Sequence, residues 1–178
     1  MKRILATAFA AALLGTACST LQVSTDYDKA VDFSQYKTFS YHDTGEARND
    51  IAAGRIENAL SDALAAKGLR RVEKDGDLWL VAHPRLSKQT QINTYNTGWG
   101  YGYGWRGGYG GMGTSTSTVS EIPVGTLVVD LVDGKRKDLV WRGTASDTLK
   151  AEASPEEREK KVREVAAELF AGFPPAKK

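Results

Sequence analysis

LVVDLVDGKRKDLVWR, residues 127–142, consists of two apolar runs joined by a polar segment, and this pattern predicts a β-hairpin. A five-residue connection, Gly134–Asp138, fixes which residues lie opposite each other on the two strands. Two cross-strand pairs follow from it: Leu131 with Trp141, and Asp130 with Arg142. One face of the hairpin is therefore expected to be apolar, while the other carries an ion pair. The whole hairpin is expected to span Gly125 to Thr148.

Three further strands are predicted upstream of this hairpin, because their side chains alternate between two faces. They are residues 19–26, with Leu21 and Val23 on one face, Lys37–Tyr41, and Asp77–Leu86. The third is apolar on both faces, so we expect it inside the sheet, with Pro84 near its end.

Two amphipathic helices are predicted from apolar residues that recur every three or four positions. The first runs from Asp50, which can cap its start, to Gly68, which suits a left-handed stop. The second begins with a capping box from Ser154 to Glu157 and ends at Gly172.

These elements predict one α+β domain, a two-layer sandwich in which a mostly antiparallel sheet carries both helices on one face. The other face of the sheet is then partly open. We expect residues 25–173 to form this domain, with a Gly/aromatic-rich insert at 97–114 and a C-terminal tail at 174–178. Residues 1–17 and 18–24 are expected to be a signal peptide and a lipidated tether, for the following reasons.

The N-terminus has the composition of a secretory signal peptide. Lys2 and Arg3 precede an apolar segment of 11 residues, 4–14, which is too short for a membrane-spanning helix of roughly 20 residues. Cys18, the only cysteine in the sequence, follows the small residues 15–17. Such a cysteine is either a spare thiol or the lipid-modified first residue of a mature bacterial lipoprotein, and we favour lipidation.

The segment Leu13–Cys18 resembles a lipobox. This resemblance implies a diacylglyceryl thioether and an acylated amine on Cys18, since one acyl chain alone holds a protein only marginally. Ser19 stands where an Asp would mark retention in the inner membrane of enteric bacteria. The resemblance therefore implies a protein of the outer membrane that is anchored by its N-terminal lipid and faces the periplasm.

The charge of the mature chain excludes one class of partner. Cleavage before Cys18 removes two of the 24 Lys and Arg and leaves 22 of them against 22 Asp and Glu. Nucleic-acid binding requires a basic excess to contact phosphates, so we expect no nucleic-acid partner. With its cysteine lipidated, the domain must also fold without an internal disulfide, which the remaining 161 residues allow.

The insert is the most unusual part of the sequence. Between Gly98 and Gly113, nine of sixteen residues are glycine and five are aromatic: Trp99, Tyr101, Tyr103, Trp105 and Tyr109. A dinucleotide-type glycine pattern occurs in it, but no helix former follows, which argues against nucleotide binding. The insert is either a mobile hairpin extension without a ligand or an adhesive patch. As a patch, its rings would bind sugars, the membrane interface or a partner protein.

Catalytic and metal-binding patterns are sparse, so we predict no catalytic residues, no metal and no cofactor. His42 and His83 are the only histidines, and no cysteine spacing supports zinc. Three acidic residues, Asp26, Asp28 and Asp32, are more simply explained by a solvated turn than by a carboxylate cluster. The pair Asp130 and Arg142 is either a structural bridge or a recognition site for a carboxylate or sugar on the open sheet face.

Several motifs resemble a family of bacterial lipoproteins that carry the domain of unknown function 4136. They include Tyr36-Lys37-Thr38-Phe39, Gly125–Asp130, Leu139–Ala145 and Phe173-Pro174-Pro175. The resemblance implies an envelope lipoprotein with an α+β fold and brings no catalytic residues. We therefore expect a non-enzymatic module that binds an envelope protein or a glycan. The alternative is an envelope hydrolase whose carboxylate and histidine are brought together only by the fold.

Overall fold

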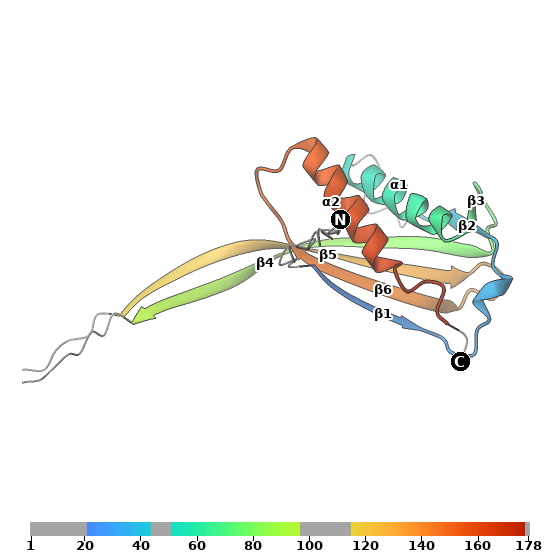
Figure 1. Cartoon of the computed structure of the whole chain (residues 1–178), viewed down its shortest axis with the longest axis horizontal. Coiled ribbons are helices and arrows are strands. Elements are labelled where there is room, and N and C mark those ends of the chain that lie inside the picture. The colour runs from blue at the N-terminus through green and yellow to red at the C-terminus, as the bar shows by residue number, and fades with distance from the viewer. Residues whose placement is uncertain (1–20, 44–50, 97–114, 177–178) are drawn as a thin grey trace, which may run out of the picture.

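The computed structural model describes residues 21–43, 51–96 and 115–176, which form one six-stranded sheet and two α-helices (Figure 1). Cys18, Asp50 and the aromatic residues of the insert lie outside the described residues. In chain order the elements are β1 (Gln22–Tyr27), the 3-10 turn η1 (Phe33–Gln35), β2 (Thr38–Tyr41), α1 (Ile51–Ala66), β3 (Arg70–Arg71), β4 (Leu78–Asn96), β5 (Ser115–Asp133), β6 (Leu139–Thr148) and α2 (Pro155–Leu169).

The strand order across the sheet is β1-β6-β5-β4-β2-β3. The pairs β1/β6, β6/β5 and β5/β4 are antiparallel, whereas β2 runs parallel to both β4 and β3. The predicted α+β class is confirmed, but the sheet is mixed. The reason is that α1 connects β2 to β4, and a crossover through a helix returns the chain in the same direction.

The predicted hairpin register is confirmed. Leu131 lies opposite Trp141 and Asp130 opposite Arg142, and a register shift follows between Leu131 and Val132. Since neighbouring residues of a strand face opposite ways, these two pairs lie on opposite faces of the sheet. Leu131 and Trp141 face the helices, and Asp130 and Arg142 face the open side.

Strands β4 and β5 are much longer than predicted, at 19 residues each. They pair from Leu78/Asp133 to Asn96/Ser115, whereas β6 ends with Thr148 opposite Val124. The pairs from Lys88/Pro123 outward therefore have no third strand of the described chain beside them. We call this two-stranded ribbon, residues 88–96 and 115–123, the arm; it projects far from the body of the domain (Figure 1).

The placement of Pro84 near the end of its strand was wrong, because β4 continues to Asn96. Pro84 lies opposite Leu127 and has no N–H to donate. The backbone of Leu80 faces β2, since its carbonyl accepts a hydrogen bond from His42, and Pro84 faces the same way by alternation. Because β2 ends at Tyr41, Pro84 lies beyond the strand with which it could not have bonded.

Both helices lie side by side over one face of the sheet, and the core lies between the two layers (Figure 1). Trp141, only 2% exposed, stacks on Phe170 with 5.0 Å between ring centroids and meets Phe173 edge-on at 5.8 Å. A Cβ on Gly143 would come within 2.5 Å of the indole. The glycine two residues after Trp141 therefore leaves the space that the ring fills.

The helix ends follow the predicted signals where the structure describes them. At the start of α2, Ser154 Oγ accepts a hydrogen bond from the Glu157 N–H at 3.2 Å, and the Glu157 carboxylate accepts one from the Ser154 N–H at 2.8 Å. After α1, Gly68 adopts φ +92° and turns the chain so that Leu69 is buried.

Candidate functional site

The open face of the sheet carries the predicted ion pair. Arg142 donates from Nε to Asp130 Oδ1 at 2.6 Å and from Nη2 to Asp130 Oδ2 at 2.7 Å. The Asp130 side chain is 10% exposed and that of Arg142 is 50% exposed. The geometry is bidentate, so this bridge holds β5 to β6 while half of the guanidinium remains accessible to solvent.

His83 on β4 joins this pair. Its Nε2 lies 3.7 Å from Asp130 Oδ2, too far for a strong hydrogen bond and close enough for a charge interaction when the imidazole is protonated. Since both Asp130 oxygens accept from Arg142, this carboxylate is poorly placed to act as a general base. We call His83, Asp130 and Arg142 the face cluster.

His42 belongs to a different group. Its ring stacks on Trp79 with 4.1 Å between centroids, and the Lys137 ammonium lies 3.3 Å from the centroid of the same indole. Burial lowers the pKa of His42, and the charge of Lys137 lowers it further. The imidazole is therefore neutral at pH 7, and it packs against Trp79 rather than joining His83.

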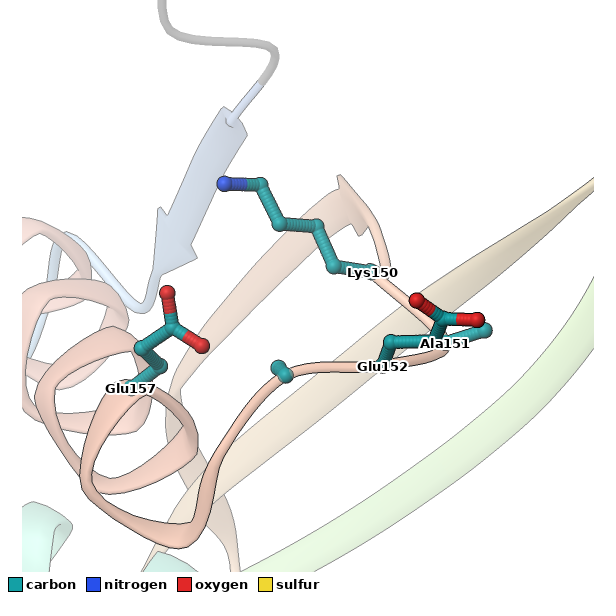
Figure 2. A pocket seen from close by; sticks show the side chains of 5 residues that line it. Lys150, Ala151, Glu152 and Glu157 are labelled. Carbon is teal, nitrogen blue, oxygen red and sulfur yellow. The ribbon is translucent and has the colours of Figure 1, made fainter.

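Neither of two shallow hollows in the described part of the chain includes a histidine or Asp130. One lies between the connection before α2 and the first turn of that helix (Figure 2); it is lined by Lys150, Ala151, Glu152, Ala153 and Glu157. Figure 2 shows the labelled charged side chains pointing in different directions rather than at a common point. The other is lined by Tyr41, Glu57, Arg70, Arg71, Val72, Glu73 and Lys74. The histidines and carboxylates therefore do not converge in either hollow.

The three acidic residues near β1 make local contacts. Asp28 accepts a hydrogen bond from the Ala30 N–H at 2.8 Å, and Asp32 accepts from the Ser34 N–H at 3.1 Å and caps η1. Asp26 accepts from the adjacent Tyr27 N–H at 2.9 Å. These contacts fit the solvated turn that was favoured from the sequence, and the described residues hold no group of three potential metal ligands.

A buried polar group that the sequence analysis missed lies at the β5–β6 turn. Asp133, 7% exposed, accepts hydrogen bonds from the Tyr36 hydroxyl at 2.9 Å and from the N–H groups of Lys135 and Arg136. Burial alone would raise the pKa of Asp133, but these hydrogen bonds lower it to about 2. Burial also raises the pKa of Tyr36 to about 12, with Asp133 adding to the effect. The only sequence signal for this group is an Asp at the start of a polar turn. Its partner Tyr36 lies 97 residues away in sequence, so the hydrogen bond could not be predicted from local pattern.

This group predicts a pH dependence of stability. Because the pKa of Asp133 is lowered on folding, its contribution is complete above the unfolded value of 3.8 and is lost as the pH falls toward 2. The contribution is on the order of 2 kcal/mol. We expect Asp133→Asn to reduce the free energy of unfolding at pH 6, measured by urea denaturation, and the difference from wild type to shrink between pH 4 and pH 2. A difference that stays constant over this range would contradict the assignment.

One protein family and several solved structures are similar to this chain. The family described as "Domain of unknown function (DUF4136)" matches residues 23–175. No curated protein matches the sequence. A PDZ domain protein from Parabacteroides distasonis shares 14% identity at a TM-score of 0.56 over 90% of this chain, which spans only 36% of that protein.

Two other solved structures show weaker likeness. The PelC dodecamer from Paraburkholderia phytofirmans shares 14% identity at a TM-score of 0.47, covering 85% of this chain and 95% of that one. A minor lipoprotein from Acinetobacter baumannii shares 14% identity at a TM-score of 0.38, covering 78% and 89%. Within the described residues, no helix has the length and hydrophobicity needed to span a membrane.

Proposed function

Because the chain belongs to the DUF4136 family, whose function is unknown, we propose a function from the geometry of the domain: a lipid-anchored module of the cell envelope that binds a partner and catalyses no reaction. Cys18 carries the lipid in this proposal. The protein would then lie at the periplasmic side of the outer membrane.

The observation that carries this proposal is that, among the described residues, both helices cover the same face of the sheet and none covers the other (Figure 1). The face cluster lies at its centre, and serine and threonine side chains flank it on β1, β5 and β6: Ser24, Thr126, Thr144 and Ser146. Thr126 Oγ1 and Ser146 Oγ lie 3.0 Å apart. A surface of hydroxyl groups around a half-exposed guanidinium suits a partner that presents carboxylates or sugar hydroxyls.

The hydrolase alternative has weaker support. The approach of His83 to Asp130 at 3.7 Å is its best observation, but Asp130 already binds Arg142 through both oxygens. Neither hollow includes these residues, and catalysis needs a site that surrounds the reacting atoms. We therefore propose a protein or a glycan of the envelope as the ligand of the open face.

Crosslinking in intact cells tests the partner. A photoreactive residue at Thr144, half-buried on the open face, is compared with one at Lys160, exposed on α2. The proposal expects an adduct from Thr144 to an envelope protein or glycan and none from Lys160. Equal labelling at both positions, or adducts at neither, would contradict a binding role for the open face.

The insert is a further candidate contact, through Trp99, Tyr101, Tyr103, Trp105 and Tyr109. Deleting Thr97–Thr114 joins Asn96 directly to Ser115, and these two residues can then form a two-residue turn closed by the pair Tyr95 and Thr116. The deleted form is expected to unfold cooperatively. When the crosslinking is repeated with this deleted form, an adduct that disappears depends on the insert, and an adduct that remains depends only on the open face.

The lipid anchor gives a separate prediction. Cys18→Ala removes the only sulfur to which the diacylglyceryl group could be attached, so the protein should move from the membrane fraction to the soluble fraction. Fractionation of cells by sedimentation, followed by mass spectrometry of the mature N-terminus, measures this change. A Cys18→Ala protein that still sediments with membranes would contradict the anchor.

A further inference from the structure

We infer that the end of the sheet from which the arm projects faces the lipid surface, and that the arm lies along this surface. The occupant of the proposed contact is the membrane that holds the acyl chains of Cys18. This inference rests on the proposed lipid anchor and adds the orientation of the domain to it.

The tether and the arm leave the same end of the sheet. Gln22 begins β1 opposite Ser146, and Ser146 lies opposite Thr126, close to the base of the arm. Three residues, 19–21, separate Cys18 from Gln22. Four fully extended Cα–Cα steps reach at most about 14 Å, so this end of the sheet is held close to the lipid headgroups.

The opposite orientation is excluded by length. If the β5–β6 turn faced the membrane, the start of β1 would stand above it by most of the length of β6, because Gln22 lies opposite Ser146 and β6 begins at Leu139. The seven residue steps from Leu139 to Ser146 span roughly 24 Å of antiparallel strand, which exceeds the tether's reach of about 14 Å. The arm end must therefore be the membrane-proximal end.

The arm cannot point straight into the bilayer from there. Its nine residue pairs span roughly 30 Å, about the thickness of the hydrocarbon core, and no other described strand pairs with either of its edges. Unsatisfied backbone N–H and C=O groups are too costly in hydrocarbon for a lone ribbon. An arm that starts within the reach of the tether and avoids the core must run along the headgroup layer.

The exposed apolar side chains fit this orientation. Five large hydrophobic residues are exposed among the side chains that the structure describes. Val119 lies in the arm and Leu86 and Leu149 at its base, whereas Leu139 lies at the opposite end of the sheet and Ile51 begins α1. Leu86 is 73% exposed and pairs with Gly125, over which the Leu149 side chain packs. Lys150 follows Leu149 in sequence, and long cationic side chains can reach headgroups above buried apolar neighbours. Lys88, at the base of the arm, is paired with Glu121 at 2.9 Å, so this pair adds no net charge to the contact.

The test uses the lipidated protein in vesicles of phosphatidylethanolamine and phosphatidylglycerol that contain brominated lipid. Since Cys18 is the only native cysteine and is lipidated, a cysteine introduced elsewhere can be labelled alone with a fluorophore. Leu149→Cys and Leu139→Cys are a matched pair, because the two leucines flank opposite ends of β6 and are 40% and 44% exposed. Val119→Cys reports on the arm.

We expect loss of fluorescence at Leu149→Cys and Val119→Cys, and fluorescence at Leu139→Cys equal to that in vesicles without bromine. Equal quenching at both leucines, or no quenching at Val119→Cys, in protein that floats with the vesicles overturns the orientation. If quenching at Val119→Cys is lost when the protein density in the vesicles is raised, the arm pairs with a second copy of the chain, and this result also overturns the proposed orientation. Protein that fails to float, with Cys18 unmodified, refutes the anchor itself.

Discussion

Trp141→Ala is expected to lower the free energy of unfolding by about 3–5 kcal/mol, because it empties the centre of the core. The indole is 2% exposed and contacts Phe170 and Phe173, which belong to the segment that ends α2. Its loss leaves a cavity that Gly143, without a side chain, cannot fill. Urea denaturation followed by far-UV circular dichroism measures the change, and the midpoint of thermal unfolding should fall by roughly 10 °C.

Trp79→Ala is the matched control. Trp79 is half-buried on the open face, where it contacts His42 and Lys137 rather than the core between sheet and helices. Its replacement should cost clearly less than that of Trp141. If Trp141→Ala costs under about 1 kcal/mol, the ring does not support the packing of α2 on the sheet.

Signals that act over a few residues were sufficient for much of the fold. The register of Asp130 with Arg142 follows from the length of one turn, and the start of α2 follows from Ser154 and Glu157. In each case the interacting groups lie within about a dozen residues, so local geometry determines the contact.

The parallel part of the sheet and the length of the arm depend on other information. The direction of β2 relative to β4 is set by the crossover through α1. The amphipathic pattern predicts this helix but not that the strands on either side of it are neighbours in the sheet. None of the arm residues whose burial the structure describes, 88–90 and 117–123, is buried against a core. Selection for an alternating apolar pattern is therefore weak in this part of β4. Without that alternation, a strand is not recognisable by its period.

The candidate site, like the fold, was predicted from sequence only where its contacts are local. Asp130 and Arg142 were paired correctly because they share a hairpin, whereas His83 reaches Asp130 from the neighbouring strand β4. The Tyr36–Asp133 hydrogen bond joins residues 97 positions apart, and only the sheet topology brings them together. Contacts of this range need the strand order, which the sequence patterns did not provide.

Gly76→Ala is expected to destabilise the domain by about 3 kcal/mol or more, because the added methyl would meet backbone rather than a movable side chain. A Cβ at this position would lie 2.4 Å from the Ser40 nitrogen and 2.5 Å from the Phe39 carbonyl carbon, in the middle of β2. Ser40 and Phe39 are fully buried, so β2 can shift only by breaking its pairing with β4. Urea denaturation, with expression level as a second readout, measures the effect.

Gly54→Ala provides the control with the opposite sign. Gly54 lies within α1, is exposed, and has nothing within 4 Å of the position that a Cβ would take. The same substitution should therefore stabilise the protein by about 0.5–1 kcal/mol through helix propensity. Because both variants replace glycine with alanine, their difference isolates the close approach of residue 76 to β2. A Gly76→Ala protein as stable as wild type would show that β2 and the turn before β4 are not packed backbone to backbone.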